Sequence, residues 1–330
     1  MGTDVTVTAG ATIDTSTGII RLANTQTLDV ASRIVASGGA MIRVFTAHSF
    51  VFEGARVIGN YPFAAVAAGE IVLSGKLDAS ADGTSPGPGA TLATSSCKGA
   101  STSYKDCQGN DCGFGTGGGG NGTAGGEGGT EFGPFAAAGN AVTSFAPFAG
   151  GCAGGDHIDQ NGIAHAGGAG GGAVQLVSGT SITFRDSGFI DVGGGGGPYG
   201  HGGGAGGTVV LEAPTISLDG QTSGVTANGG AGGSCNTAGP DGGPALICAF
   251  AATPANCHSV GGNGGSVEFP ARNAAQCAGT GGFCFVGFLI GGGGGGAVGK
   301  ALFRTRTGAV AELNSPTIGV PVTNQSLVTQ

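Results

Sequence analysis

Apolar and polar residues alternate along several short stretches of the chain, and two of these stretches repeat one another. Residues 173–192 and 208–227 each hold three alternating runs, with a glycine tract between the two sets. Alternation with period two predicts β-strands that bury one face. The apolar positions of the two sets correspond one to one: Val174 with Val209, Leu176 with Leu211, Ile182 with Ile216, Phe184 with Leu218, Ile190 with Val225, and Val192 with Ala227.

The same three-strand unit is predicted nearer the N-terminus, after a first strand at residues 4–8. One unit covers residues 20–36, a second covers 42–57, and a third resumes at Ile71. The first two units begin at Ile20 and Ile42, which places them 22 residues apart. Repeats of roughly 20–50 residues are typical of solenoids, in which each unit buries its apolar face against the next.

We therefore predict an all-β chain built on a parallel β-solenoid with about 22 residues per coil. This periodicity resembles that of the right-handed parallel β-helix family, and parallel crossovers are overwhelmingly right-handed. The resemblance covers residues 13–80, 173–192 and 208–227. Further along, Val267 and Phe269 are expected to repeat the step of Val209 and Leu211, and so is Leu302.

Glycine changes this picture, because 76 of the 330 residues are glycine and most of them lie in tracts. Such tracts are typical of flexible linkers. They also suit polyglycine II, an extended left-handed helix with three residues per turn and no internal hydrogen bonds. The tracts at 115–129 (GTGGGGNGTAGGEGG) and 164–173 (AHAGGAGGGA) resemble the polyglycine II bundles of glycine-rich phage tail-fibre adhesins. They are also similar to the G-G-x repeats of mycobacterial PGRS surface proteins.

The predicted organisation has four parts. Solenoid coils occupy 1–82, and a glycine- and cysteine-rich insertion that would form the polyglycine II bundle occupies 83–172. Solenoid strands alternate with glycine tracts over 173–310, and residues 311–330 form an extended arm or an edge strand, since two prolines interrupt them.

Charge and motifs exclude several classes of partner. The net charge is −8, with only 12 lysines and arginines, which argues against nucleic acid. The apolar core of the segment 281–299 is about eight residues long, whereas a membrane span needs roughly twenty. Matches to G-x-G-x-x-G are expected by chance in so glycine-rich a chain, and no helix follows them, so we expect no cofactor.

The cysteines bear on the cellular compartment. They lie in or beside glycine-rich segments, which favours disulfides over thiols or metal ligands, and their odd number leaves at least one unpaired within the chain. Met1-Gly2-Thr3 leads straight into alternating residues, which suggests a mature exported protein whose leader is absent. We therefore expect an extracellular or cell-surface protein. The nine cysteines are Cys97, Cys107, Cys112, Cys152, Cys235, Cys248, Cys257, Cys277 and Cys284.

Three segments are candidates for a functional site. Asp156, His157, Asp159 and His165 form the densest polar group and would suit a metal or acid–base site, although a solvated loop between two glycine tracts is the favoured explanation. His201 is either a side chain displayed on a glycine scaffold or a spacer. An apolar run is either an interaction surface or a core strand, and its candidate residues are Phe283, Phe285, Phe288, Leu289 and Ile290.

No catalytic residues are predicted. Carboxylates on the inferred strands, such as Asp78 and Asp191, occupy different places in their units and are not expected to pair. The leading prediction is an extracellular structural or adhesive protein, such as a surface fibre or filament subunit, that binds itself or a surface or glycan partner. The alternatives are a polysaccharide-binding or polysaccharide-degrading β-helix and, with its N-terminal threonines, an ice-binding protein.

Overall fold

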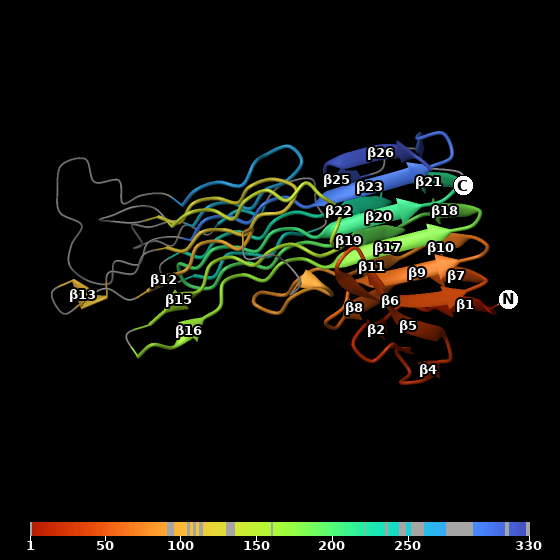
Figure 1. The fold of residues 1–330 in the computed structure, drawn as a ribbon, viewed down its shortest axis with the longest axis horizontal. Coiled ribbons are helices and arrows are strands. Elements are labelled where there is room, and N and C mark those ends of the chain that lie inside the picture. The colour runs from red at the N-terminus through yellow and green to blue at the C-terminus, as the bar shows by residue number, and fades with distance from the viewer. Residues whose placement is uncertain are drawn as a thin grey trace.

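The computed structural model describes residues 2–90, 96–103, 106–107, 110–111, 115–129, 136–159, 161–220, 222–234, 237–243, 249–251, 261–274, 293–313 and 317–327. These residues form an all-β protein, as predicted, and contain no helix. Three large and mostly parallel sheets make up a base stack, from which long extended segments project to one side (Figure 1).

Each large sheet takes one strand from every unit. The six-stranded sheet has the order β1 (Asp4–Val7), β7 (Ser49–Phe52), β10 (Ile71–Leu73), β18 (Ser181–Phe184), β21 (Thr215–Asp219), β24 (Ala311–Leu313). The seven-stranded sheet has the order β26 (Val322–Ser326), β23 (Lys300–Thr305), β20 (Thr208–Glu212), β17 (Ala173–Ser178), β9 (Phe63–Ala67), β6 (Ala40–Ala47), β5 (Ala31–Ser37). The eight-stranded sheet has the order β25 (Thr317–Gly319), β22 (Gly224–Thr226), β19 (Phe189–Asp191), β11 (Lys76–Asp78), β8 (Ala55–Ile58), β2 (Ala11–Asp14), β3 (Ile19–Arg21), β4 (Thr27–Leu28).

The register between units follows the apolar pattern. The pairings predicted between the two central units are confirmed, for example Val174 opposite Val209 and Ile182 opposite Ile216. Where no insertion intervenes, units repeat at close to the predicted spacing, as the pairing of Phe50 with Ile71 illustrates. A one-residue slip would move each buried side chain to the other face, so the pattern selects this register.

Stacked apolar side chains fill the interior between the sheets. Phe52, Leu73, Phe184 and Leu218 occupy one row across four successive units, and none of them is exposed to solvent. Burial of each such side chain contributes about 1.5–3 kcal/mol relative to an exposed one. The base stack is therefore held mainly by this continuous column.

The segment predicted as the first coil is instead an antiparallel cap, so that prediction was wrong. Strand β3 pairs antiparallel with β2 and β4, and β5 pairs antiparallel with β6. The reversals occur at Gly18, with φ of +77°, at Thr25, with φ of +69°, and at Gly38 and Gly39, with φ of +56° and +88°. Side chains in and beside these strands, such as Leu28, pack on the core and cover this end of the stack.

Two further strands differ from prediction. Strand β9 went unpredicted because its side chains are buried on both faces and do not alternate. Val267 and Phe269 do not form a strand but lie exposed in a turn, and β23 takes the place beside β20. In β23 Ala301 and Phe303 pair with Val209 and Leu211. Leu302, which was predicted to match one of these two positions, pairs with Val210 instead.

The C-terminal segment contributes edge strands to all three large sheets. Strands β24, β25 and β26 are the outermost strands of the three sheets at this end. Behind them lies a hollow of about 260 Å³. Its lining is mostly apolar and comprises Val267, Phe303, Val310, Ile318, Val320, Pro321, Val322 and Asn324.

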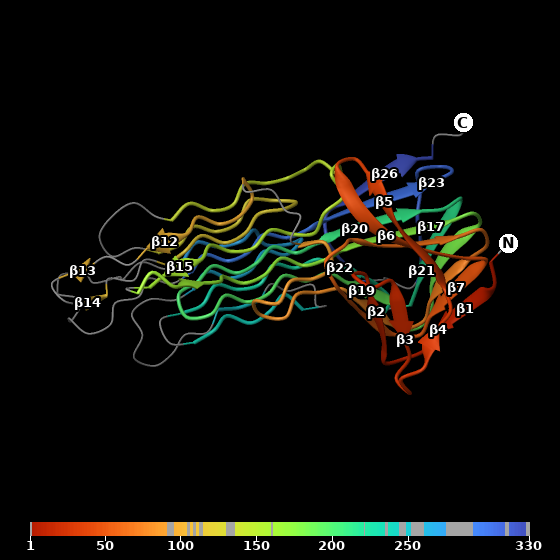
Figure 2. The same ribbon diagram turned by 60° about the horizontal axis from the view of Figure 1, so that its bottom comes forward.

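All long insertions leave the base stack at one corner, as the repeat predicts. They connect β11 to β17, β19 to β20 and β22 to β23, so each runs from the eight-stranded to the seven-stranded sheet. Figure 2 shows the inserted segments side by side, pointing away from the sheets. We refer to them together as the glycine bundle.

Backbone hydrogen bonds hold the glycine bundle together. One row of six consecutive N–H···O=C bonds, each 2.7–2.9 Å long, crosses seven segments. Where two tracts run alongside each other, the bonds recur at every third residue, as from Gly194, Gly197 and Gly200 to residues 228, 231 and 234. The row of six passes through Gly265, Gly296, Gly230, Gly204, Gly195, Ala169 and Gly83.

Glycine is required at these positions because the backbones touch. A Cβ atom built on Gly204 would overlap the carbonyl oxygen of Ala169, and one built on Gly118 would overlap that of Gly295. Each glycine therefore brings two backbones close enough to bond, and buried backbone groups find partners without an apolar core.

Candidate functional site

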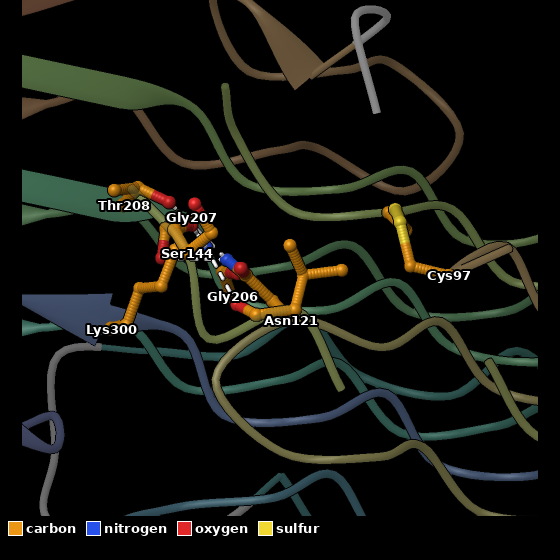
Figure 3. The surroundings of a disulfide bond; sticks show 9 residues. Cys97, Asn121, Ser144, Gly206, Gly207, Thr208 and Lys300 are labelled. Carbon is orange, nitrogen blue, oxygen red and sulfur yellow. Dashed lines mark hydrogen bonds between the residues drawn. A yellow bond between two sulfur atoms is a disulfide. The ribbon is translucent and has the colours of Figure 1, made fainter. Parts of the chain in front are cut away.

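The base of the glycine bundle is fastened to the stack by two polar side chains (Figure 3). Asn121 is almost fully buried, and its Nδ2 donates to the carbonyl oxygens of Gly206 at 2.7 Å and Gly207 at 3.0 Å. Thr208, the next residue, lies opposite Lys300 in the register of β20 and β23. Both side chains thus act where the glycine tracts become strands.

Lys300 anchors the neighbouring segment 142–145. Its Nζ donates to the carbonyl oxygens of Val142 and Ser144, each at 2.6 Å, and lies 5.4 Å from the centre of the Phe145 ring. Burial lowers the pKa of Lys300 to about 8. Because the ammonium donates to two carbonyls, we assign it a structural role. The sequence signal was a lone lysine at the junction between a glycine tract and an apolar run.

A disulfide cross-links the bundle between Cys97 and Cys152, which are both buried and whose Cα atoms are 5.7 Å apart. The predicted disulfide cross-linking is confirmed for this pair. Next to it, Lys98 forms an ion pair with Asp156. Of the other predicted cysteines, Cys107 lies in β13 (Asp106–Cys107), which pairs with β14 (Asn110–Asp111). Cys112, Cys235, Cys248, Cys257, Cys277 and Cys284 lie outside the described residues.

A small sheet lies towards the far end of the glycine bundle (Figure 1). We call this sheet the tip. It consists of β12 (Thr102–Ser103), β15 (His157–Ile158) and β16 (Ala164–His165). Thr102, His157 and His165 face one another across the three strands. The Thr102 Oγ1 atom lies 3.3 Å from His157 Nδ1.

Asp159 builds the turn of the tip hairpin. Its carboxylate accepts backbone N–H bonds from Asn161 and Ile163 and lies 3.2 Å from the Nε2 atom of His165. The N–H of Ile163 and the neighbouring His165 hold the pKa of Asp159 below its usual value. The four polar residues singled out in the sequence therefore divide: Asp156 pairs with Lys98, while His157, Asp159 and His165 lie together on the hairpin.

His201 joins this group from another segment. Its side chain is buried rather than displayed, and its ring centre lies 5.9 Å from that of His157, edge to face. The Nδ1 atom lies 2.7 Å from the carbonyl oxygen of Pro198 and 2.8 Å from that of Tyr199. Burial lowers the pKa of His201. Its Nε2 atom is buried and has no hydrogen-bond partner.

The expectation that strand carboxylates do not pair was wrong for Asp78 and Asp191, which lie opposite each other on β11 and β19. The Lys76 ammonium contacts both, and Arg56 contacts Asp78. Burial is the largest influence on the pKa of Asp191 and raises it. At Asp78 burial acts in the same direction, but hydrogen bonds from Ser80 and the charges of Arg56 and Lys76 outweigh it and lower the pKa.

Other predicted features are placed as follows. The run containing Phe283, Phe285, Phe288, Leu289 and Ile290 lies outside the described residues. Thr6 and Thr12 lie opposite Val51 and Arg56 rather than opposite other threonines. Within the described ranges, no group of three or more His, Cys, Asp or Glu side chains is arranged to hold a metal ion. No helix there is long and apolar enough to cross a membrane.

Comparison with protein-family models, with curated proteins and with solved structures finds no match to this chain.

Proposed function

We propose that this chain is an extracellular structural or adhesive protein that holds its tip away from a β-solenoid base on a rigid glycine stalk. The base would be a right-handed solenoid, because parallel crossovers overwhelmingly take that hand. The observation that carries the proposal is the row of six backbone hydrogen bonds across the glycine bundle, which ties seven segments into one body.

The three-residue recurrence of these bonds supports a polyglycine II bundle. A polyglycine II helix has three residues per turn, so every third N–H points towards the same neighbour. The bonds from Gly194, Gly197 and Gly200 follow that spacing. The bundle would thus resemble the glycine-rich bundles of phage tail-fibre adhesins in its physical principle.

Rigidity is what an adhesive stalk requires. A flexible linker of this composition would place its end anywhere within a broad volume. Here the Cys97–Cys152 disulfide and the bonds of Asn121 and Lys300 fix the stalk along its length and at its base. Disulfides persist in oxidising compartments, which supports an extracellular location.

The C-terminal end of the base stack offers a means of attachment. Among the strands that the structure describes, its outermost strands β24, β25 and β26 have one neighbour each, and an apolar hollow lies beside them. Unpaired strand edges are templates for pairing with another chain. We propose that copies of the protein associate through this end, while the cap covers the other.

A second candidate function, polysaccharide degradation, is favoured by one observation. Asp78 and Asp191 form a pair of facing carboxylates, the kind of pair that glycoside hydrolysis uses. The Asp191 side chain is only 3% exposed and forms an ion pair with Lys76, which supports a structural role instead. Release of reducing sugar that is lost in an Asp191→Asn variant would favour the enzyme.

The adhesive role can be tested by removing the tip hairpin. In the variant, residues 157–165 are replaced by a two-residue Asn-Gly turn, which leaves the stalk segments connected. Fluorescently labelled protein is incubated with insoluble cellulose, chitin and peptidoglycan, and the retained fraction is measured. We expect at least one of these surfaces to retain the intact protein and to retain much less of the tip variant.

Two controls separate stalk from tip. An Ile34→Lys variant changes an exposed position on the cap strand β5 and should be retained like the intact protein. Negative-stain microscopy with and without reductant reports whether the stalk is present and whether copies associate. Equal retention of the tip variant, or a molecule without a projecting stalk, contradicts the proposal.

A further inference from the structure

The Nε2 atom of the buried His201 imidazole receives no hydrogen bond. Carbonyl oxygens can only accept, so the Nδ1 atom facing Pro198 and Tyr199 must carry the proton. In the neutral ring the Nε2 atom then holds a free lone pair. That atom is buried and has no hydrogen-bond partner, and His201 as a whole is only 7% exposed.

A buried polar atom without a partner is costly, typically about 1–3 kcal/mol. A histidine whose other nitrogen donates to a backbone carbonyl is also the usual arrangement of a metal ligand, because that bond fixes the tautomer and the ring orientation.

A second imidazole lies beside it at a suitable separation. Two imidazoles on one tetrahedral zinc ion, with Zn–N bonds of about 2.0–2.1 Å, bring their ring centres roughly 5 Å apart. The ring centres of His157 and His201 are 5.9 Å apart. The contact between its Nδ1 atom and Thr102 orients the His157 ring beside that of His201.

We propose that His201 and His157 form a binding site at the tip for a divalent transition-metal ion such as Zn²⁺, with its remaining coordination positions taken by water or an external ligand. Imidazole nitrogen is a preferred donor for Zn²⁺, Cu²⁺ and Ni²⁺. His165 is not assigned to the site, because the ring that lies beside that of His201 is the ring of His157, whereas His165 contacts Asp159. The site does not depend on the adhesive role.

Titration of the tag-free protein with Zn²⁺ tests this site. Free thiols are first blocked with iodoacetamide, so that cysteine cannot bind the metal. Isothermal titration calorimetry should detect one Zn²⁺ per chain. Co²⁺ in its place should give the d–d absorption of a nitrogen- and oxygen-ligated ion without thiolate charge-transfer bands.

Four histidine variants test which side chains bind the ion. His201→Gln and His157→Ala should each weaken Zn²⁺ binding about tenfold or more. His165→Ala and His48→Ala, the latter on the base stack, should bind as the unmodified chain does. Since His157 is half-exposed on β15, its variant remains informative if His201→Gln does not fold. No Zn²⁺ binding, unchanged binding in His157→Ala, or loss in His165→Ala overturns the proposal.

Discussion

Asp191 lies directly opposite Asp78 on the neighbouring strand of the eight-stranded sheet. Two like charges in facing positions destabilise a sheet, so the pair needs a cation. The Lys76 Nζ atom supplies it, 3.0 Å from Asp191 and 3.2 Å from Asp78. Arg56, 2.8 Å from Asp78 on the next strand, extends the alternation of charge.

Replacing Lys76 by methionine should destabilise the protein in a pH-dependent way. Burial raises the pKa of Asp191, so the folded state holds this proton to a higher pH than the unfolded state does. The free energy of unfolding therefore falls as pH rises through that interval, and loss of Lys76 steepens the fall. We expect Lys76→Met to cost about 2 kcal/mol at pH 7 and less at pH 4, as measured by urea denaturation.

A double variant supplies the control for this pair. Lys76→Met with Asp191→Asn removes both the cation and the buried charge, and should recover most of the stability lost at pH 7. An equal loss at pH 4 and pH 7 in the single variant would show that packing, not charge, explains the effect.

Lys300 should give the opposite pH dependence. Burial lowers its pKa from 10.5 to about 8, so between these values the unfolded state binds the additional proton. The free energy of unfolding should rise with pH over this interval, by up to about 3 kcal/mol. Lys300→Met should remove that rise, whereas Lys98→Met, at a half-exposed lysine, should retain it. Urea denaturation between pH 7.5 and 10.5 measures both.

The Cys97–Cys152 disulfide should stabilise the glycine bundle more than the base stack. It closes a loop with a sequence separation of 55 residues, for which the loss of chain entropy in the unfolded state predicts about 4 kcal/mol. In the Cys97→Ser/Cys152→Ser variant, hydrogen exchange should accelerate at 96–103 and 149–155. Exchange in β10 and β18 should stay slow, and uniform acceleration would mean that stalk and base unfold together.

A single methyl group should disrupt the bundle at Gly204. A Cβ atom there would overlap the carbonyl oxygen of Ala169, so Gly204→Ala must separate two bonded backbones. Gly243 has no heavy atom within 4 Å of its Cβ position, which makes Gly243→Ala the matched control. Thermal unfolding should show a loss of about 1–3 kcal/mol for the first variant and almost none for the second.

Alternation predicted strands well where one face is buried and the other is exposed. The apolar pattern alone matches Ile182 with Ile216 and Phe184 with Leu218, and both pairs face each other in the six-stranded sheet. The pattern could not predict strand direction, because a run alternates equally in parallel and antiparallel pairs. Direction at the cap depends on the left-handed conformation of Gly18 and Gly38, which composition alone does not reveal.

The candidate site was harder to predict than the fold. His157 and His165 could be grouped because they are close in sequence and share a hairpin. His201 comes from a different tract, and its place beside His157 depends on how the glycine segments pack. Asp78 and Asp191 were missed for a similar reason, since an insertion separates their strands and hides their common register.

The three-residue recurrence of the bundle hydrogen bonds has a consequence for natural variation in length. In the polyglycine II bundle proposed above, adding one residue to a tract would turn the residues beyond it by about a third of a turn and point their N–H groups at the wrong neighbour. Adding three would restore the facing partners and move the tract onward by roughly 9 Å. Insertions and deletions among homologous chains should therefore occur in multiples of three within the tracts that Gly194, Gly197 and Gly200 exemplify.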